Sequence, residues 1–371
     1  MINSRPRFPR KLAATLSLVI AGGGLAVASA AGTAQAATPN AWGYALVLNP
    51  AVSGPVTAGH WKESKPSPTP TSTAGAVGQV FVSFPKIGLY KQGVVHVTAV
   101  IDEFAWCQAQ RWYPTGGKEV VAVRCYRKGG VPAFVPFTVL FTTSSGKLAG
   151  GLKYAYVHDN GTSITSAYNS TGLPVTVTSL GTGVWRARVQ GPSPATHSGG
   201  IQLTAVNSTR PAICDVAGQT WTPSAQTIIV RCYTPAGKPL KTGWNLTYQR
   251  GRALTGGKPN LFAYTLNNKP TIAGPYAPAP PAVNVNSGGG VNTIQRSGGG
   301  EWLVKLPRVG LLPNTMFVTA AATPPRVCNL NDLWVTMTTP AGPGLVTMRD
   351  VVCYKLNGAM TATKWFLSYT T

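Results

Sequence analysis

A pattern of about 110 residues occurs three times in this chain of 371 residues, and it constrains the fold more than any other feature. Each copy contains an aromatic-rich segment, an alternating segment after a glycine, a third apolar segment, two cysteines with a tryptophan between them, and a closing aromatic segment. The matched segments are 43–47, 153–157 and 261–265; 80–84, 185–189 and 302–306; 97–99, 203–205 and 318–320; 137–141, 244–248 and 365–369. We therefore expect three copies of one structural module.

The repeated segments alternate between apolar and polar residues with a period of two, which is typical of β-strands. Charged residues make up only 11% of the chain, and glycine and proline number 42 and 31, which argues against a helix-rich protein. A hydrophobic content of 44% argues against general disorder. The sequence predicts an all-β protein of three tandem antiparallel β-sandwich-like domains, either immunoglobulin-like or small barrels, over residues 37–150, 151–257 and 258–371.

The six cysteines fall two to a repeat, which favours a disulfide framework in an exported protein. The repeat selects one pairing out of the possible ones, with each bridge inside its own copy. The predicted disulfides are Cys107–Cys125, Cys214–Cys232 and Cys328–Cys353. Metal binding is the alternative, but the chain has no C-x₂-C pair and no histidines beside the cysteines. We expect neither a metal nor a cofactor.

The N-terminal segment has the three parts of a secretory signal peptide. Four cations, Arg5, Arg7, Arg10 and Lys11, precede an apolar stretch over residues 12–31, and Ala34-Gln35-Ala36 supplies an A-x-A cleavage site. The alternative is a membrane anchor, which the glycines at 22–24 and the cleavage site disfavour. We expect residues 1–36 to be removed and no transmembrane segment to remain.

No catalytic set is recognisable in the sequence. The nine carboxylates include no pair that recurs in the repeats, as a glycosidase would require. His158 and Asp159 are adjacent, but adjacency in sequence is not the arrangement of a catalytic triad, and no G-x-S-x-G elbow accompanies them. A surface turn is the better interpretation of these two residues. We expect a protein that is not an enzyme, although one diverged repeat could still be active.

Positive charge is the remaining functional signal. The formal net charge is +23, and the excess of cations is spread evenly over the three repeats. Such a surface attracts polyanions such as anionic wall polymers, whereas sequence-specific nucleic-acid binding is not expected. Solubility charge on an outer sheet face is the alternative. The candidate contact residues are Arg186 and Arg188 on one face of a strand, Lys305 at the Arg188 position of the third repeat, and Arg124 and Arg231 before the second cysteine.

Tryptophans are a second possible binding element, because sugar rings stack on exposed aromatic faces. Trp112, Trp221 and Trp334 recur between the paired cysteines, which favours core packing. Trp42, Trp61 and Trp106 have no clear counterparts, so we expect these three to be the exposed ones. Of these, Trp61 is the candidate contact for a glycan.

The order of these motifs resembles the tandem repeats of exported actinobacterial proteins of unknown function. The resemblance covers residues 42–371, with Gln190 in place of the strand-end prolines Pro85 and Pro307 and a longer third cysteine loop. It implies secretion, with loose association to the cell envelope as a further expectation, and transfers no catalytic residue. We expect a secreted binder of polyanions or glycans; the alternatives are a secreted hydrolase or inhibitor and a structural spacer.

Overall fold

The computed structural model describes residues 40–57, 59–65, 68–88, 92–145, 153–191, 198–256, 261–340 and 342–371. The predicted signal peptide and the predicted boundaries near residues 150 and 257 lie outside these ranges. By their contacts, residues Ala37–Thr371 form one compact unit. Within the described part of the chain, no helix is long and apolar enough to span a membrane.

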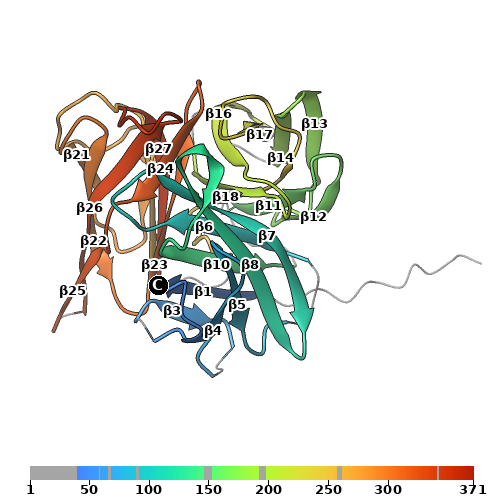
Figure 1. The fold of residues 1–371 in the computed structure, drawn as a ribbon. Helices are drawn as coiled ribbons and strands as arrows, with labels where there is room; N and C mark the ends of the chain where they lie inside the picture. Colours follow the sequence, from blue (N-terminus) through green and yellow to red (C-terminus); the bar gives the residue numbers. More distant parts are fainter. Residues whose placement is uncertain are drawn as a thin grey trace, which may run out of the picture. The chain divides into compact units, whose positions relative to one another are not determined.

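The predicted fold class is confirmed: the described residues form antiparallel β-sheets, with two short 3₁₀ turns and no α-helix (Figure 1). Each repeat contributes two sheets that pack face to face around a hydrophobic core. One parallel bridge, between Ala109 and Val206, joins a sheet of the first repeat to a sheet of the second, so that these two form a single ten-stranded sheet. In the first repeat, for example, Val139 of one sheet and Val123 of the other belong to the same buried cluster. We call the two sheets of a repeat the inner and the outer sheet.

The inner sheet has the same strand order in all three repeats. In the first it consists of β3 (Trp61–Glu63), β1 (Ala41–Val47), β10 (Phe137–Thr143) and β6 (Val94–Ala99). In the second it consists of β12 (Ile164–Asn169), β11 (Lys153–Asp159), β18 (Gly243–Arg250) and β15 (Gly200–Val206). In the third it consists of β20 (Asn284–Asn286), β19 (Phe262–Asn267), β27 (Lys364–Thr370) and β23 (Thr315–Ala321).

The outer sheets are built around the cysteine-bearing hairpin. The first repeat uses β2 (Gly54–Pro55), β4 (Thr71–Ala74), β5 (Gln79–Phe84), β8 (Lys118–Arg127), β7 (Ala105–Thr115) and β9 (Val131–Pro132). The second uses β13 (Val175–Gly181), β14 (Val184–Gln190), β17 (Ala225–Tyr233) and β16 (Ile213–Thr222). The third uses β21 (Thr293–Arg296), β22 (Glu301–Gly310), β26 (Gly342–Lys355), β24 (Arg326–Leu330) and β25 (Val335–Thr339).

All three predicted disulfides are present, and each joins two cysteines that lie directly opposite one another in a hairpin. The first hairpin shows why the register is so well defined. Thr115 pairs with Lys118, and the two residues between them, Gly116 and Gly117, both have positive φ angles of 53° and 77°. Two consecutive positive φ angles are the requirement of a type I′ turn, which fixes the register of the strands that it joins.

Three of the four strands of each inner sheet are buried on both faces, because the face that points away from the core packs against a neighbouring repeat; the edge strands β3, β12 and β20 are partly exposed. Every residue of β6, β10 and β1 is buried, the polar ones included. The edges of the three inner sheets also meet. The backbone amides of Val97, Leu203 and Val318 donate to the hydroxyls of Thr204, Thr319 and Thr98, at 3.2, 3.0 and 3.2 Å respectively.

These three hydrogen bonds form a closed cycle in which the second repeat binds the first, the third binds the second, and the first binds the third. We call Thr98, Thr204 and Thr319 the threonine ring. A strand at the edge of a sheet leaves backbone groups unpaired, and buried amides require partners. The ring supplies those partners from the next repeat.

The register of the opening strands corrects their predicted alignment. Gly43, Ala155 and Ala263 lie opposite the equivalent residues Phe141, Tyr248 and Tyr369, so residues 43–47 align with 155–159 and not with 153–157. The tyrosine after each small residue reaches the neighbouring repeat: the hydroxyl of Tyr156 accepts from Ser144, that of Tyr264 accepts from Gly251, and that of Tyr44 donates to the carbonyl of Pro313.

Candidate functional site: an arginine face and a pocket between repeats

Arg186 and Arg188 are exposed on the outer face of the second repeat's outer sheet. They alternate along β14 with the buried residues Trp185, Ala187 and Val189, so both side chains point away from the core. Exposed threonines lie directly opposite them on β13: Thr178 faces Arg186 and Thr176 faces Arg188. We call these four residues the arginine face.

Arg231 shares this side of the sheet but is tied to the third repeat. It lies opposite Val184 on β14 and is half-buried, and its guanidinium donates to the hydroxyl of Thr323 at 3.1 Å. Asp215 lies opposite it on β16, fully buried, and accepts from the amide of Arg326. Burial raises the pKa of Asp215 to about 8, against the opposing effect of that hydrogen bond and of the nearby Arg231 and Arg326 charges.

The second repeat displays no exposed carboxylate. Its two acidic residues, Asp159 and Asp215, are 2% and 0% exposed. Acidic side chains gather instead where the first and third repeats meet. Burial first, and then the charges of Asp102, Glu301 and Glu103, raise the pKa of Tyr354 to about 12. The surface charge is therefore unevenly distributed, although the cations are spread evenly over the sequence.

The remaining predicted contact residues lie on other sheets. Lys305 is exposed on β22 of the third repeat, at the position that corresponds to Arg188. Arg124 is half-buried on β8 of the first repeat, with its guanidinium 5.9 Å from the centre of the Tyr126 ring. Trp61 is half-buried on β3 and packs against the first core. Only Arg186, Arg188 and Arg231 share one sheet face.

The prediction that Trp42 and Trp106 are exposed is wrong: they are 8% and 6% exposed. Trp42 stacks on Tyr44 with ring centres 5.8 Å apart, in the aromatic pair that Tyr154 and Phe262 begin in the other repeats. Trp106 donates its indole N–H to the carbonyl of Ala212, across the contact with the second repeat. By register Trp42 corresponds to Tyr154 and Phe262, and Trp106 precedes its cysteine as Ile213 and Val327 do. Both tryptophans fill contacts between repeats and not an exposed site.

The prediction of a surface turn at His158 and Asp159 is wrong for these two residues: they are the last two of β11, and Asp159 is buried. The ring of His158 packs edge-on against Trp112 of the first repeat, with centres 4.7 Å apart, and Nδ1 lies 3.3 Å from the carbonyl oxygen of Trp244. Asp159 accepts from the amide of Gly161 at 2.7 Å, as in a tight turn. Outside the undescribed gaps, no group of three or more His, Cys, Asp or Glu residues is placed to hold a metal ion.

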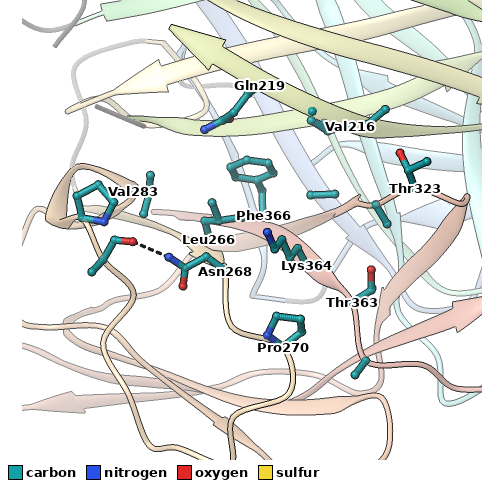
Figure 2. A pocket seen from close by; sticks show the side chains of 17 residues that line it. Val216, Gln219, Leu266, Asn268, Pro270, Val283, Thr323, Thr363, Lys364 and Phe366 are labelled. Atoms are coloured by element: carbon teal, nitrogen blue, oxygen red, sulfur yellow. Dashed lines mark hydrogen bonds between the residues drawn. The ribbon is translucent and has the colours of Figure 1, made fainter. Parts of the chain in front are cut away.

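A pocket of about 720 Å³ lies between the second and third repeats. Figure 2 shows Val216 and Gln219 of β16 on one side and Leu266, Lys364 and Phe366 of the third repeat on the other. This volume is within the range of small-molecule sites in proteins. None of the predicted contact residues lines it.

The contact between the second and third repeats departs from the other two at the position of the pocket. Between the first and second repeats, Asn207 donates to the carbonyl of Ala109; between the third and first, Ile101 donates to the carbonyl of Leu330. The equivalent residues at the third contact, Ala321 and Val216, form no bridge, although the structure describes both. Both residues line the pocket.

Comparisons with protein-family models, with curated proteins and with solved structures found no match for this chain.

Proposed function

We propose that this protein is a secreted, non-enzymatic binder of extracellular polyanions, and that the arginine face of the second repeat is its contact surface. The observation that carries the proposal is the pair of exposed arginines on a repeat whose only two carboxylates are buried. A polyanion that approaches this repeat meets no exposed negative side chain. The three disulfides indicate an oxidising environment, which supports an extracellular location.

The spacing of the face suits a polymer better than a single ion. Residues two apart on a strand lie about 7 Å from one another, so Arg186 and Arg188 form two neighbouring positive positions. Each arginine has a threonine hydroxyl opposite it on β13. A guanidinium binds a phosphate or sulfate group with two hydrogen bonds, and the hydroxyl offers a third. We infer that successive anionic groups of one chain occupy the two Arg–Thr pairs.

The test is the binding of residues 37–371 to an immobilised phosphodiester polymer over a range of salt concentrations. The double variant Arg186→Ser/Arg188→Ser should bind at least tenfold more weakly. The slope of the logarithm of the binding constant against the logarithm of the salt concentration should also become shallower, by about 0.9 per lost contact if the polymer behaves as duplex DNA does. The matched control is Arg349→Ser/Lys355→Ser, which removes two exposed cations from β26 of the third repeat.

Loss of binding in the first double variant alone supports the arginine face. Equal loss in both variants would show that overall charge, and not this face, attracts the polymer. Absence of binding at low ionic strength would overturn the polyanion proposal and favour a structural spacer. Turnover in a panel of substrates would favour the hydrolase alternative.

A further inference from the structure

The pocket between the second and third repeats is lined by the residue that corresponds to a tryptophan of the first repeat. Trp112 pairs with Val121, four residues before the second cysteine of its repeat. In the second repeat the residue at this register is Gln219, which pairs with Ile228, four residues before Cys232. Trp221 is two positions further along the strand and pairs with Gln226. An indole in one repeat is thus replaced by a shorter amide in the next.

The ring that faces this tryptophan is replaced as well. Trp112 packs on His158 of the second repeat, and the residue that corresponds to His158 in the third repeat is Leu266. Gln219 and Leu266 both line the pocket. Two aromatic rings at one contact between repeats are therefore two non-aromatic side chains at the other, where the aromatic ring is Phe366, at the position of Asn245. At the remaining contact the residue that corresponds to His158 is Leu46, and Trp334 packs edge-on against a different residue, His60, with ring centres 5.1 Å apart.

A positively charged side chain, Lys364, lines this pocket. Lys364 lies opposite Ala321, as Gly243 lies opposite Val206 in the second repeat, so the lysine takes the place of a glycine. Lys364 is exposed, lines the pocket, and makes no ion pair with any described residue. Deeper in, the ring of Phe366 is buried within the core cluster of the second repeat. Figure 2 shows this ring between Gln219 and Leu266, with the Lys364 amine beside them.

We propose that this pocket binds a small aromatic acid. The planar ring of the ligand enters the pocket beside the Phe366 ring and packs against Phe366 and Leu266. The carboxylate of the ligand pairs with the Lys364 ammonium group at the mouth, and the Gln219 amide is placed to hydrogen-bond a polar atom on the ring. Apolar walls with a few polar groups are the usual composition of a small-molecule site. This activity is separate from the arginine face, which shares no residue with the pocket.

The probe is indole-3-acetate, with the uncharged indole-3-acetamide as its matched ligand. Binding to residues 37–371 is measured by calorimetry and by saturation-transfer NMR. We expect saturable binding of the acid and at least fivefold weaker binding of the amide. Lys364→Ser should remove that difference between the ligands. Gln219→Trp, which restores the indole of the first repeat, should weaken binding at least tenfold.

Thr220→Trp is the matched control, because Thr220 is exposed on the same strand and is not among the pocket residues. It should bind the acid as the wild type does, and circular dichroism should show all variants folded. Absence of saturable binding at millimolar acid would overturn the proposal. Undiminished binding by folded Gln219→Trp would also overturn it, because the ligand would then lie elsewhere. Equal affinity for acid and amide would refute the role of Lys364.

Discussion

The hydroxyl of Thr98 lies within hydrogen-bond distance of both the amide and the carbonyl of Val318, at 3.2 and 3.3 Å, although the two residues are 220 positions apart. The Thr319 hydroxyl accepts from the amide of Leu203 in the same way, but the nearer acceptor for its own proton is Oε1 of Gln202, at 2.8 Å, and not the carbonyl of Leu203, at 3.3 Å. A single hydroxyl can accept from an amide and donate to a carbonyl at once. The threonine ring thus completes the edge strands of the inner sheets with side chains from neighbouring repeats, and it ties the first repeat to the third.

Removal of one ring hydroxyl should destabilise the protein. Thr204→Val keeps the shape of the side chain but leaves the buried amide of Val97 without its partner, and it also removes a neighbour of His96 Nδ1 at 3.3 Å. A buried donor left unsatisfied costs about 1–3 kcal/mol in the free energy of unfolding. Denaturant titration measures the loss. Thr178→Val, at an exposed position of β13, should change stability by less than about 0.5 kcal/mol.

His96 should make the protein less stable in acid. It is 1% exposed between the hydroxyls of Thr204 and Thr247, and burial lowers its pKa to about 3. The unfolded chain protonates this histidine near pH 6.5 and the folded one does not, so stability falls as the pH drops from 6.5 towards 3. The slope contributed by this group reaches about 1.4 kcal/mol per pH unit.

The variant His96→Gln should remove this slope. The second repeat has a glutamine at the equivalent position, Gln202, which donates to Ser368 and accepts from Thr319. Unfolding free energies of the wild type and the variant are compared at pH 7 and at pH 4.5. The prediction fails if the difference between the two proteins is the same at both pH values.

Glu119 should make the protein less stable as the pH rises, the reverse of the effect of His96. It is fully buried, its two carboxyl oxygens have no hydrogen-bond partner among the described residues, and burial raises its pKa to about 8. The folded protein keeps this proton between about pH 4.5 and 8 while the unfolded chain releases it, so stability falls as the pH rises through that range. Glu119→Gln should match the wild type near pH 4.5 and be more stable by a few kcal/mol at pH 8.

Thermal or denaturant unfolding at both pH values tests this, with Asp332→Asn, an exposed carboxylate, as the control that should leave the pH profile unchanged. A variant no more stable than the wild type at pH 8 would show that Glu119 is ionised in the folded protein.

The strands and the disulfides could be predicted because both depend on the pattern of residues close together in the sequence. Alternation identified the strands, and the repeated Cys-Trp-Cys order identified the disulfides, because a hairpin places its two cysteines opposite one another. The contacts between repeats could not be predicted in this way. His96 and Thr98 alternate with valines in β6, which is typical of a sheet with one face in water, yet they are only 1% and 4% exposed. Their partners are more than 100 residues away, beyond the reach of any local pattern.

One sequence signal did point to the pocket. The tryptophan follows the first cysteine by five residues in the first repeat and by seven in the second. On a strand, that shift of two keeps the same face but moves the ring about 7 Å along it, which leaves Gln219 at the contact. Alignment by motif order alone treated Trp112 and Trp221 as equivalent. The spacing from the cysteine and the cross-strand register both separate them.

The cyclic contacts predict that the three repeats unfold together. Each inner sheet is covered on its second face by neighbours, so loss of one repeat exposes buried residues of the other two. Trp302→Ala removes a fully buried ring from the third core, which costs about 3–5 kcal/mol. The free energy of the opening that permits amide hydrogen exchange should fall by the same amount at Val121, in the first core, and at Val351, in the third. Faster exchange confined to the third repeat would show that the repeats are independent folding units joined in one chain.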